Sequence, residues 1–592
     1  MRLDLGDWLI ILAYFVVSAV LGLIYTRRAG SSLTEYFLSG RALPWWLAGT
    51  SMVATTFSAD TPLVVAGLVA KYGVAGNWLW WNGAVSGILT VFFFARLWRR
   101  AGVLTDLEFA ELRYGGKPAA ALRGFRALYL ALPVNLIIMG WVTRAMVTVL
   151  EISLNINPWQ AAVLLFLITA GYTMFSGLWG VVVTDAFQFV VKMGGVILLA
   201  VLAVQSIGGL DVLTERASQH FGSYEAAFGM LPPTDRAWLP VSTLLVFLAV
   251  QWWATWYPGA EPGGGGYIAQ RVLAAKDERH GLLATLWFNI AHYALRPWPW
   301  ILVGFVALLR YPGLANPEEG YVRVMVDVLP SPMKGLLLAT FAAAYMSTIG
   351  THLNWGASYL VNDVYLRFVN PAAGRRAQVI ASRGATIVLM LLSLVVMAYL
   401  KSVEQGWKLL IGLGAGTGLV FILRWYWWRI NAWSEISAMA ASFVTSIALQ
   451  AAHLDSGNTS SPDYAIALLT TVGVTTVVWL SVTLLTAPES PETLDRFYRR
   501  VRPGGAGWRD VAQQLGFGND QIPGGVLSWV NWIAGVTAVY SAVFGVGALV
   551  TGRRGSGVVY LGLAIVAFAL IQRNLRADNQ LAGSVDTAPA AP

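Results

Sequence analysis

The hydrophobic positions of this chain gather into long apolar runs that are separated by short polar segments. The run WLIILAYFVVSAVLGLIYT (8–26) is typical, since about 20 apolar residues are the length that a helix needs to cross a bilayer. The pattern predicts an all-α polytopic membrane protein with about 15 transmembrane helices. The expected spans are approximately 8–26, 44–70, 77–98, 124–150, 158–177, 181–206, 238–258, 281–310, 333–363, 384–402, 407–428, 435–453, 463–486, 525–551 and 556–573.

The composition agrees with a membrane protein and excludes a large soluble enzyme. Hydrophobic residues make up 57% of the 592 positions and charged residues only 12%, with a mean hydropathy of +0.60. Ordinary soluble domains carry about 25% charged residues. The chain has no cysteine, which excludes disulfides, thiolate chemistry and cysteine metal sites. With five histidines and no acid-rich metal motif, we expect a protein that is not an enzyme.

The positions of the basic residues favour a membrane over a nucleic acid as the reason for the formal charge of +9. Most Lys and Arg fall in alternate loops, among them RLWRRAG (96–102), AAGRRAQ (372–378) and FYRRVRPGG (497–505). Cytoplasmic loops carry such an excess. The pattern predicts an external N-terminus, a retained first span and a cytoplasmic C-terminus, although Arg553 and Arg554 fall on the other side. We expect no nucleic-acid partner and no obligatory protein partner.

Two of the predicted spans contain residues that interrupt a helix. The segment LAGTSMVATTFSADTPLVVAGL (47–68) carries Asp60 and Pro62 in its middle, and five spans later the chain reads YPGAEPGGGG (257–266). Inverted repeats of five helices, each opening with a broken helix, are common in transporters, and the freed backbone groups bind ions there. The alternative is that 257–266 forms a re-entrant or interfacial loop with no ligand role.

The repeat hypothesis divides the chain into six parts. These are a leading helix with its cytoplasmic loop (1–43), inverted repeat 1 (44–206), an external loop (207–237), inverted repeat 2 (238–428), about four extra C-terminal helices with a cytoplasmic loop at 487–524 (429–577), and a disordered tail (578–592).

A face of small and hydroxyl-bearing residues runs along the span at 333–363. Ala344, Ser347, Thr348 and Thr351 are spaced at i, i+3, i+4 and i+7, which places them on one side of a helix. Hydroxyl oxygens suit a hard monovalent cation. The alternative is that these small residues only pack helices together, as they commonly do in membranes.

Charged residues inside the apolar segments are candidates for function, because each is costly there. Asp60 and Glu261 lie in the two interrupted segments, and Asp185 lies in a third span, where a structural ion pair with Lys192 is the alternative. Arg296 has two open roles: it binds an anionic substrate, or it caps the carbonyls of a broken helix.

Most of the 27 tryptophans are expected at the membrane interfaces or in packing roles. The run WYWW (425–428) beside Arg424 is interpreted as part of an interfacial belt, whereas Trp80 could stack on a ring of a solute.

Several motifs, in the same order, resemble the sodium:solute symporter family, which includes sodium/glucose, proline, pantothenate and sialic-acid symporters. The resemblance covers about residues 8–430. It rests on TEYFLSGRALPWW (34–46), TTFSADTPLVVAG (55–67), EFAELRY (108–114), GLWGVVVTDAFQ (177–188), YIAQRVLAAKD (267–277) and AAAYMST…NDVY (342–365).

The resemblance implies a leucine-transporter-like core of two inverted five-helix repeats after one leading helix. It also implies a sodium site made by the carbonyls of Ala54, Phe57 and Ala344 and the hydroxyls of Ser347 and Thr348, with Asp185 close by. Some members bind a second sodium through the same acid and two further hydroxyls, at the positions of Gly350 and Thr351. Because Gly350 has no hydroxyl, we expect one sodium ion here.

The resemblance also suggests where a solute binds. The corresponding residues, together with the charged residues chosen above, are Ser58, Asp60, Thr61, Trp80, Gly83, Thr255, Tyr257, Glu261 and Arg296. Trp80 and Gly83 replace acid and hydroxyl side chains of sugar-binding members, and the GAEPGGGG segment is longer than its counterpart.

The expected function is therefore sodium-coupled symport of a small polar solute (sugar, amino acid or organic acid) by alternating access. The family indicates a multi-pass protein of the inner (plasma) membrane. Two alternatives use the same scaffold: a proton-coupled symporter, in which Asp60, Asp185 or Glu261 carries the proton, and a transporter-like solute sensor.

Overall fold

Helices make up nearly all of the described chain, as its apolar runs predict. The computed structural model describes residues 3–24, 38–103, 105–173, 178–231, 240–255, 262–454, 462–518 and 520–586. Within these ranges the β-structure found is one isolated bridge between Leu43 and Ala275. The all-α prediction is confirmed for this part of the chain.

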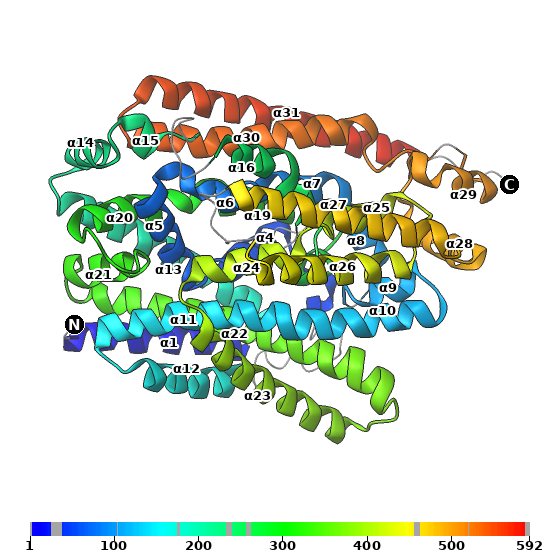
Figure 1. The fold of residues 1–592 in the computed structure, drawn as a ribbon, viewed down its shortest axis with the longest axis horizontal. Coiled ribbons are helices and arrows are strands. Elements are labelled where there is room, and N and C mark those ends of the chain that lie inside the picture. The colour runs from blue at the N-terminus through cyan, green and yellow to red at the C-terminus, as the bar shows by residue number, and fades with distance from the viewer. Residues whose placement is uncertain are drawn as a thin grey trace.

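Most of the helices run in nearly the same direction and form an elongated bundle (Figure 1). In the described residues, nine helices are long and apolar enough to cross a membrane, or up to eleven if each of two bent pairs counts as one span. The outer helices also present large apolar side chains to their surroundings, such as Val559 and Ile565. The chain is therefore a multi-pass membrane protein, and the count of about 15 spans stays a prediction.

The first part of the bundle is built from the leading helix and the helices up to residue 205. They are α1 (Leu5–Ile24), α4 (Trp45–Thr56), α5 (Asp60–Tyr72), α6 (Trp78–Trp81), α7 (Gly83–Leu89), α8 (Ala95–Ala101), α9 (Glu108–Arg113), α10 (Gly116–Tyr129), α11 (Asn135–Leu154), α12 (Pro158–Thr173) and α13 (Leu178–Gln205).

The second part follows two short helices, α14 (Leu210–Phe221) and α15 (Tyr224–Phe228), at one end of the bundle (Figure 1). It contains α16 (Val241–Val246), α17 (Trp252–Ala254), α18 (Gly266–Ala274), α19 (Glu278–Ile290), α20 (Pro297–Arg310), α21 (Glu319–Val328), α22 (Met333–Ser358), α23 (Arg375–Tyr399), α24 (Val403–Gly414) and α25 (Gly418–Tyr426).

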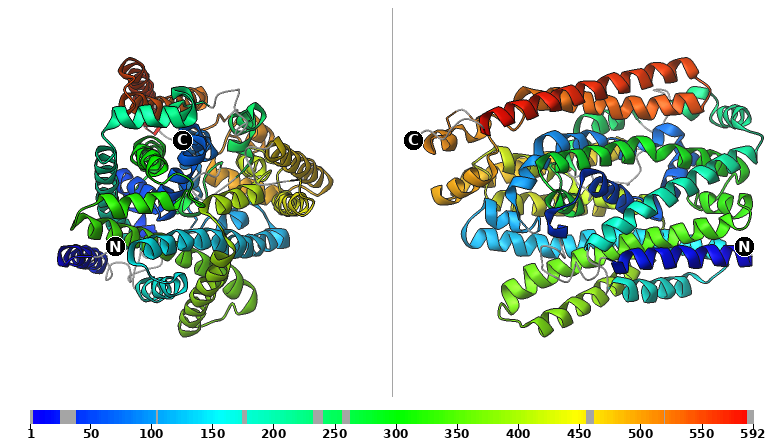
Figure 2. Two further views of the ribbon diagram at one scale, coloured as in Figure 1. Left: turned by 60° about the vertical axis from the view of Figure 1, so that its left-hand side comes forward. Right: turned by 180° about the vertical axis from the view of Figure 1, so that it is seen from behind.

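The C-terminal helices form two hairpins on the outside of the bundle. One is α26 (Ala432–Ala451) with α27 (Pro462–Leu485), and the other is α30 (Gly525–Val550) with α31 (Arg554–Asp586), along a separate flank (Figure 2). The chain between the two hairpins forms α28 (Pro491–Val501) and α29 (Arg509–Gln514). These two helices lie at the opposite end of the bundle from α14 (Figure 1). Helix α31 extends to Asp586, so residues 578–586 of the expected disordered tail are helical.

The first predicted break is present. Helices α4 and α5 meet at an angle of 60°, and Phe57 between them leaves the helical region with φ −87° and ψ 70°. Pro62 falls in the first turn of α5, where its missing N–H has no helical partner to lose. The break lies inside the bundle, because α4 packs against α13, α19 and α22.

The second predicted break is described only at its two sides. The helix ends at Ala254 and the chain becomes helical again at Gly266, while residues 256–261 lie outside the described chain. Gly263 and Gly264 adopt φ of +89° and +74°, which favours glycine, and they approach the side chains of Phe94 and of Thr90 and Trp98, respectively. The Gly263 carbonyl accepts a hydrogen bond of 2.7 Å from the Trp98 indole.

A further break was not expected from the sequence. Helices α24 and α25, predicted as one span at 407–428, are bent by 48° around residues 415–417. Gly416 there has a φ of +88°, and its N–H donates to the carbonyl of Ala254 at the end of α17. The signal was present in GLGAGTG (412–418), because glycines in a membrane helix permit such a turn.

The interpretation of WYWW as an interfacial belt is wrong for its first member. Trp425 is fully buried and its backbone carbonyl accepts from the indole of Trp508 at 2.7 Å. The neighbouring Arg424 is also buried, because Glu435 binds both Arg424 (3.3 Å) and Arg126 (3.1 Å). A buried carboxylate thus draws the arginine, and with it the start of this run, into the protein.

Replacing Glu435 by glutamine should strongly destabilise the protein, since Arg126 and Arg424 are then left as buried cations without a counter-charge. Breaking a buried pair by removing one partner costs about 3–5 kcal/mol. Thermal unfolding of purified protein in detergent measures the loss. Glu225→Gln is the matched control, because Glu225 pairs with Arg553 at an exposed site and should leave the unfolding temperature unchanged. Equal unfolding temperatures for the two variants would contradict this role of Glu435.

Candidate functional site

The break between α4 and α5 faces two buried cationic side chains. The Lys192 ammonium on α13 lies 3.1 Å from the Phe57 carbonyl oxygen and 3.4 Å from that of Ala54. These are two of the carbonyls that the family resemblance assigns to sodium. Helix α4 ends here, with the Phe57 N–H donating to the carbonyls of Val53 and Ala54. The carbonyl end of a helix carries partial negative charge and attracts cations.

The second cation at the break is Arg296, which precedes α20. Its guanidinium donates to the Val53 carbonyl at 3.3 Å and to the Thr56 hydroxyl at 3.1 Å, and it contacts His292. It also lies over the ring of Trp300, 5.3 Å from the ring centre. Of the two roles left open for Arg296, this geometry is that of a cap for the broken helix.

Asp185 brings three helices together beside the break. Its carboxylate accepts hydrogen bonds from the hydroxyls of Ser51 on α4 (2.7 Å) and Ser347 on α22 (2.9 Å). Arg271 on α18 also reaches Ser51, at 3.4 Å, and contributes positive charge to the same buried cluster. The carboxylate of Asp185 therefore bonds to two serines, while Lys192, two turns further along α13, bonds to backbone.

The predicted hydroxyl face of α22 points at the first break. The Thr348 hydroxyl donates to the Thr55 carbonyl at 3.2 Å, and Ala344 is buried one turn earlier on the same face. The structure thus gathers Ala54, Phe57, Ser347 and Thr348 where α4, α13 and α22 meet. Periodicity in the sequence was sufficient to predict this face, because Ser347 and Thr348 had to share one side of the helix with Ala344.

A cavity of about 80 Å³ lies between the first break and the end of α17. Thr61, Trp80, Gly83 and Thr255, four of the residues predicted to contact a solute, line its wall. The full lining comprises Thr56, Thr61, Leu79, Trp80, Asn82, Gly83, Ser86, Gln251, Trp252, Thr255, His292, Tyr293, Trp407 and Ile411.

Aromatic rings form much of this wall. Trp80 stacks on Tyr293 with ring centres 5.8 Å apart and planes inclined by 22°, and Trp252 and Trp407 add two further indoles. The Trp80 indole N–H donates to Asn77 at 2.9 Å, which fixes its orientation. Such a cavity offers flat apolar faces to a ring and a few polar groups for hydrogen bonds.

The other predicted solute contacts fall into two groups. Ser58 and Asp60 are buried in the break, and neither lines the cavity. The Ser58 hydroxyl and one oxygen of the Asp60 carboxylate have no hydrogen-bond partner among the described residues. Tyr257 and Glu261 lie outside the described residues, so the structure gives no position for them.

Several lining residues were missed by the sequence reasoning. Gln251 bonds to the Leu79 carbonyl and to Tyr464, and His292 bonds to Thr56 at 3.1 Å. Gln251 is a polar residue within the apolar run 241–256, which was a usable signal. No signal in the sequence distinguished Trp407, because tryptophans are common throughout the chain.

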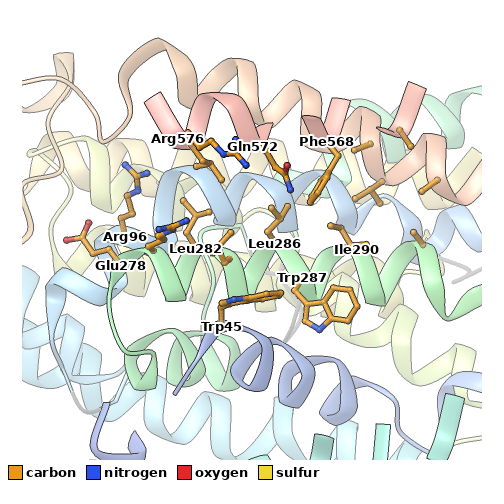
Figure 3. A pocket seen from close by; sticks show the side chains of 18 of the residues that line it. Trp45, Arg96, Glu278, Leu282, Leu286, Trp287, Ile290, Phe568, Gln572 and Arg576 are labelled. Carbon is orange, nitrogen blue, oxygen red and sulfur yellow. The ribbon is translucent and has the colours of Figure 1, made fainter. Parts of the chain in front are cut away.

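A second, larger hollow of about 1030 Å³ lies away from the breaks, between α19 and α31 (Figure 3). Its walls are mainly apolar, with arginines gathered at one end. Trp45, at the start of α4, reaches this hollow, but the turn at which α4 breaks does not line it. The smaller central cavity, which that turn does line, is therefore the candidate solute site.

Comparison with known proteins identifies the family to which this chain is similar. The model of the "Sodium:solute symporter family" matches residues 36–443. The sodium/glucose cotransporter of Vibrio parahaemolyticus is 26% identical over 463 residues, which cover 74% of this chain and 83% of that protein. The sodium/mannose cotransporter of Bos taurus is 25% identical over 498 residues, covering 76% of this chain and 80% of that protein.

A solved structure shares the overall fold of this chain. The substrate-bound, outward-open structure of a Na⁺-coupled sialic acid symporter covers 82% of this chain and 99% of its own, with 21% identity and a TM-score of 0.66. The architecture is thus shared with that symporter.

Replacing Arg296 by methionine should destabilise the protein, because the Val53 carbonyl and the Thr56 hydroxyl then lose a charged donor. A hydrogen bond to a charged group contributes about 1.5–3 kcal/mol. The temperature of unfolding in detergent should fall. Arg310→Met, at the exposed end of the same helix, is the control and should change it little. If the Arg296→Met and Arg310→Met variants unfold at the same temperature, Arg296 does not cap the break.

Proposed function

Because this chain belongs to the sodium:solute symporter family and is a sodium-coupled symporter, we propose that its solute binds in the central cavity and its sodium where α4, α13 and α22 meet. The proposed sodium ligands are the carbonyl oxygens of Ala54, Phe57 and Ala344 and the hydroxyls of Ser347 and Thr348. Asp185 holds Ser347 in place and supplies negative charge nearby.

One observation carries this proposal: the ion site and the cavity share a single turn of broken helix. The Thr55 carbonyl accepts from Thr348 on the ion side, while the next residue, Thr56, lines the cavity. Thr56 also accepts, through its carbonyl, a hydrogen bond of 3.2 Å from the Thr61 hydroxyl across the break. A change in this turn on ion binding therefore alters the cavity wall directly.

Coupling then follows from differential binding. A solute that binds only when sodium has ordered the break shifts the population toward the occupied transporter. Moving one charge inward through 100 mV releases about 2.3 kcal/mol, and the sodium concentration gradient adds to this. Alternating access converts that free energy into solute accumulation.

The solute class that suits this cavity is a small, neutral and hydroxyl-rich molecule. Among the described lining residues none is Asp, Glu, Lys or Arg, whereas Asn82, Gln251, Thr61 and Thr255 offer neutral hydrogen-bonding groups. Arg296, the candidate receptor for a carboxylate, is engaged at the helix break. Relatives that carry glucose and mannose, by their names, agree with a sugar or polyol.

The membrane arrangement is part of the same proposal. We place the protein in an inner (plasma) membrane with the N-terminus outside, the C-terminus in the cytoplasm, and two inverted five-helix repeats at 44–206 and 238–428. The loop basicity supports this orientation. The positions of α14 and α15 at one end of the bundle and of α28 and α29 at the other are consistent with it (Figure 1).

The test is uptake into proteoliposomes under an inward sodium gradient. A thermal-shift screen of sugars, polyols, amino acids and organic acids first identifies a solute, and a sugar or polyol is expected. Ser347→Ala combined with Thr348→Ala should then lower sodium-stimulated uptake by about tenfold or more, since each lost oxygen ligand weakens binding by about 1 kcal/mol.

Thr340→Ala provides the matched control for this pair. Thr340 lies on the same helix and is buried, but its hydroxyl bonds to the Leu336 carbonyl of its own helix at 2.8 Å. Unchanged sodium-stimulated uptake in the double variant would refute the ion site. Uptake driven by a pH gradient alone, with no response to sodium, would favour the proton-coupled alternative, and solute binding without any uptake would favour a sensor.

A further inference from the structure

Lys192 is a fully buried lysine whose ammonium is solvated by the broken helix. Its Nζ lies 3.1 Å from the Phe57 carbonyl and 3.4 Å from the Ala54 carbonyl, and it sits 5.6 Å from the centre of the Phe57 ring. A lysine inside a membrane helix bundle is costly, so it needs oxygen partners and a functional reason. The end of α4 supplies the partners.

The carbonyls that hold the ammonium belong to the proposed sodium site. A sodium ion and an ammonium group both require the oxygen atoms of Ala54 and Phe57, and they cannot occupy the same space. Two positive charges a few ångströms apart in a medium of low polarity also repel strongly. Sodium and Lys192 are therefore alternatives at this position.

The surrounding charges strengthen that conclusion. Lys192, Arg271 and Arg296 all lie near the break and are buried, whereas two buried carboxylates face them: Asp185 near Lys192 and Arg271, and Asp60 near Arg296. Two carboxylates do not balance three cations and an added sodium ion. Moving the ammonium away from Ala54 and Phe57 relieves the most direct repulsion.

We propose that Lys192 is a tethered cation that competes with sodium, so that sodium binds at the first break only when the ammonium is displaced. This inference rests on the proposed sodium site. It makes Lys192 a residue that sets the affinity for the coupling ion. Lysine is suited to this, because its flexible four-carbon chain carries the charge away without moving α13.

The test is a sodium titration of the purified full-length protein. The unfolding temperature is measured at each sodium concentration, and choline chloride holds the ionic strength constant. Lys192→Met should raise the apparent affinity for sodium by about tenfold or more. If the methionine variant fails to fold, Lys192→Gln takes its place, because glutamine keeps a polar group that can bond to the carbonyls. This variant should also raise the apparent affinity for sodium. Gly194→Ala is the control on the same helix, since an added Cβ there meets nothing within 4 Å.

The outcomes separate this inference from the sodium site on which it rests. An unchanged or lower sodium affinity in the folded Lys192 variants would overturn the competition. Adding Ser347→Ala and Thr348→Ala to Lys192→Met should abolish the gained affinity. If the gain persists in that triple variant, sodium binds elsewhere, and the proposed ion site fails together with the role of Lys192.

The groove between α19 and α31 carries a second, independent inference. Leu282, Leu286 and Phe568 form part of its long apolar wall, and Arg96 and Arg576 lie toward the end marked by Glu278 (Figure 3). Arg279, the residue after Glu278, also lines the groove. Arg100 at the same end is already held by Glu278, through bonds of 2.9 and 3.1 Å. The four arginines outnumber Asp277 and Glu278, so this end of the groove is positive.

A long apolar wall that ends in positive charge matches an anionic phospholipid. We propose that one such lipid binds with its headgroup at Arg279 and Arg576 and an acyl chain along Leu282 and Leu286. Basic pockets between helices on the cytoplasmic side bind such headgroups. The volume of about 1030 Å³ is large enough for an acyl chain and part of a headgroup.

Reconstitution into nanodiscs of phosphatidylglycerol or of phosphatidylcholine tests this site. The wild type should unfold at a higher temperature in phosphatidylglycerol, and Arg279→Gln with Arg576→Gln should remove most of that difference. Arg573→Gln, an exposed arginine on the same helix that does not line the groove, is the control. An equal lipid effect in the double variant, or the same stabilisation of detergent-purified protein by inorganic phosphate, would overturn the proposal.

Discussion

The structure depends on one constraint: a membrane helix that breaks in the protein interior must find partners for its freed carbonyl groups. Water is scarce there, so each unsatisfied group costs several kcal/mol. The end of α4 meets this demand with cations and hydroxyls from three other segments, namely Lys192, Arg296 and Thr348. The packing of α13, α20 and α22 around α4 is the geometric result.

That solution places ion chemistry and solute chemistry on the same few residues. The carbonyls of Ala54, Thr55 and Phe57 face the proposed ion site, while Thr56 lines the cavity. Thr61 then bonds across the gap to the Thr56 carbonyl. A broken helix thus serves as a shared wall, which a continuous helix with satisfied carbonyls could not do.

Much of this arrangement could be predicted from the sequence. Hydropathy located the helices, Asp60 and Pro62 marked the first break, and the 3.6-residue period placed Ser347 and Thr348 together. Periodicity shows which residues share a face, but it does not show what the face meets. Lys192 was therefore weighed as a partner for Asp185, although it bonds to carbonyls of α4.

Other features depended on contacts between distant segments. Arg424 looked interfacial because its partner, Glu435, lies beyond the next loop in a helix of its own. The glycines of GLGAGTG (412–418) permit the bend at residues 415–417, but its hydrogen-bond partner, the carbonyl of Ala254, lies far away in the sequence. Long-range pairing decides such cases, and a single sequence does not display it.

The bond between Gly416 and Ala254 has a consequence for how this protein moves. It joins the end of α17, at the second break, to the turn between α24 and α25, and it uses only backbone atoms. The Thr475 side chain crowds the space where a Gly416 Cβ would lie, so the turn admits little else. One backbone hydrogen bond therefore links the two unwound points. Substitution of side chains by alanine leaves this hydrogen bond intact, so a conventional mutational scan of the helices passes over the linkage.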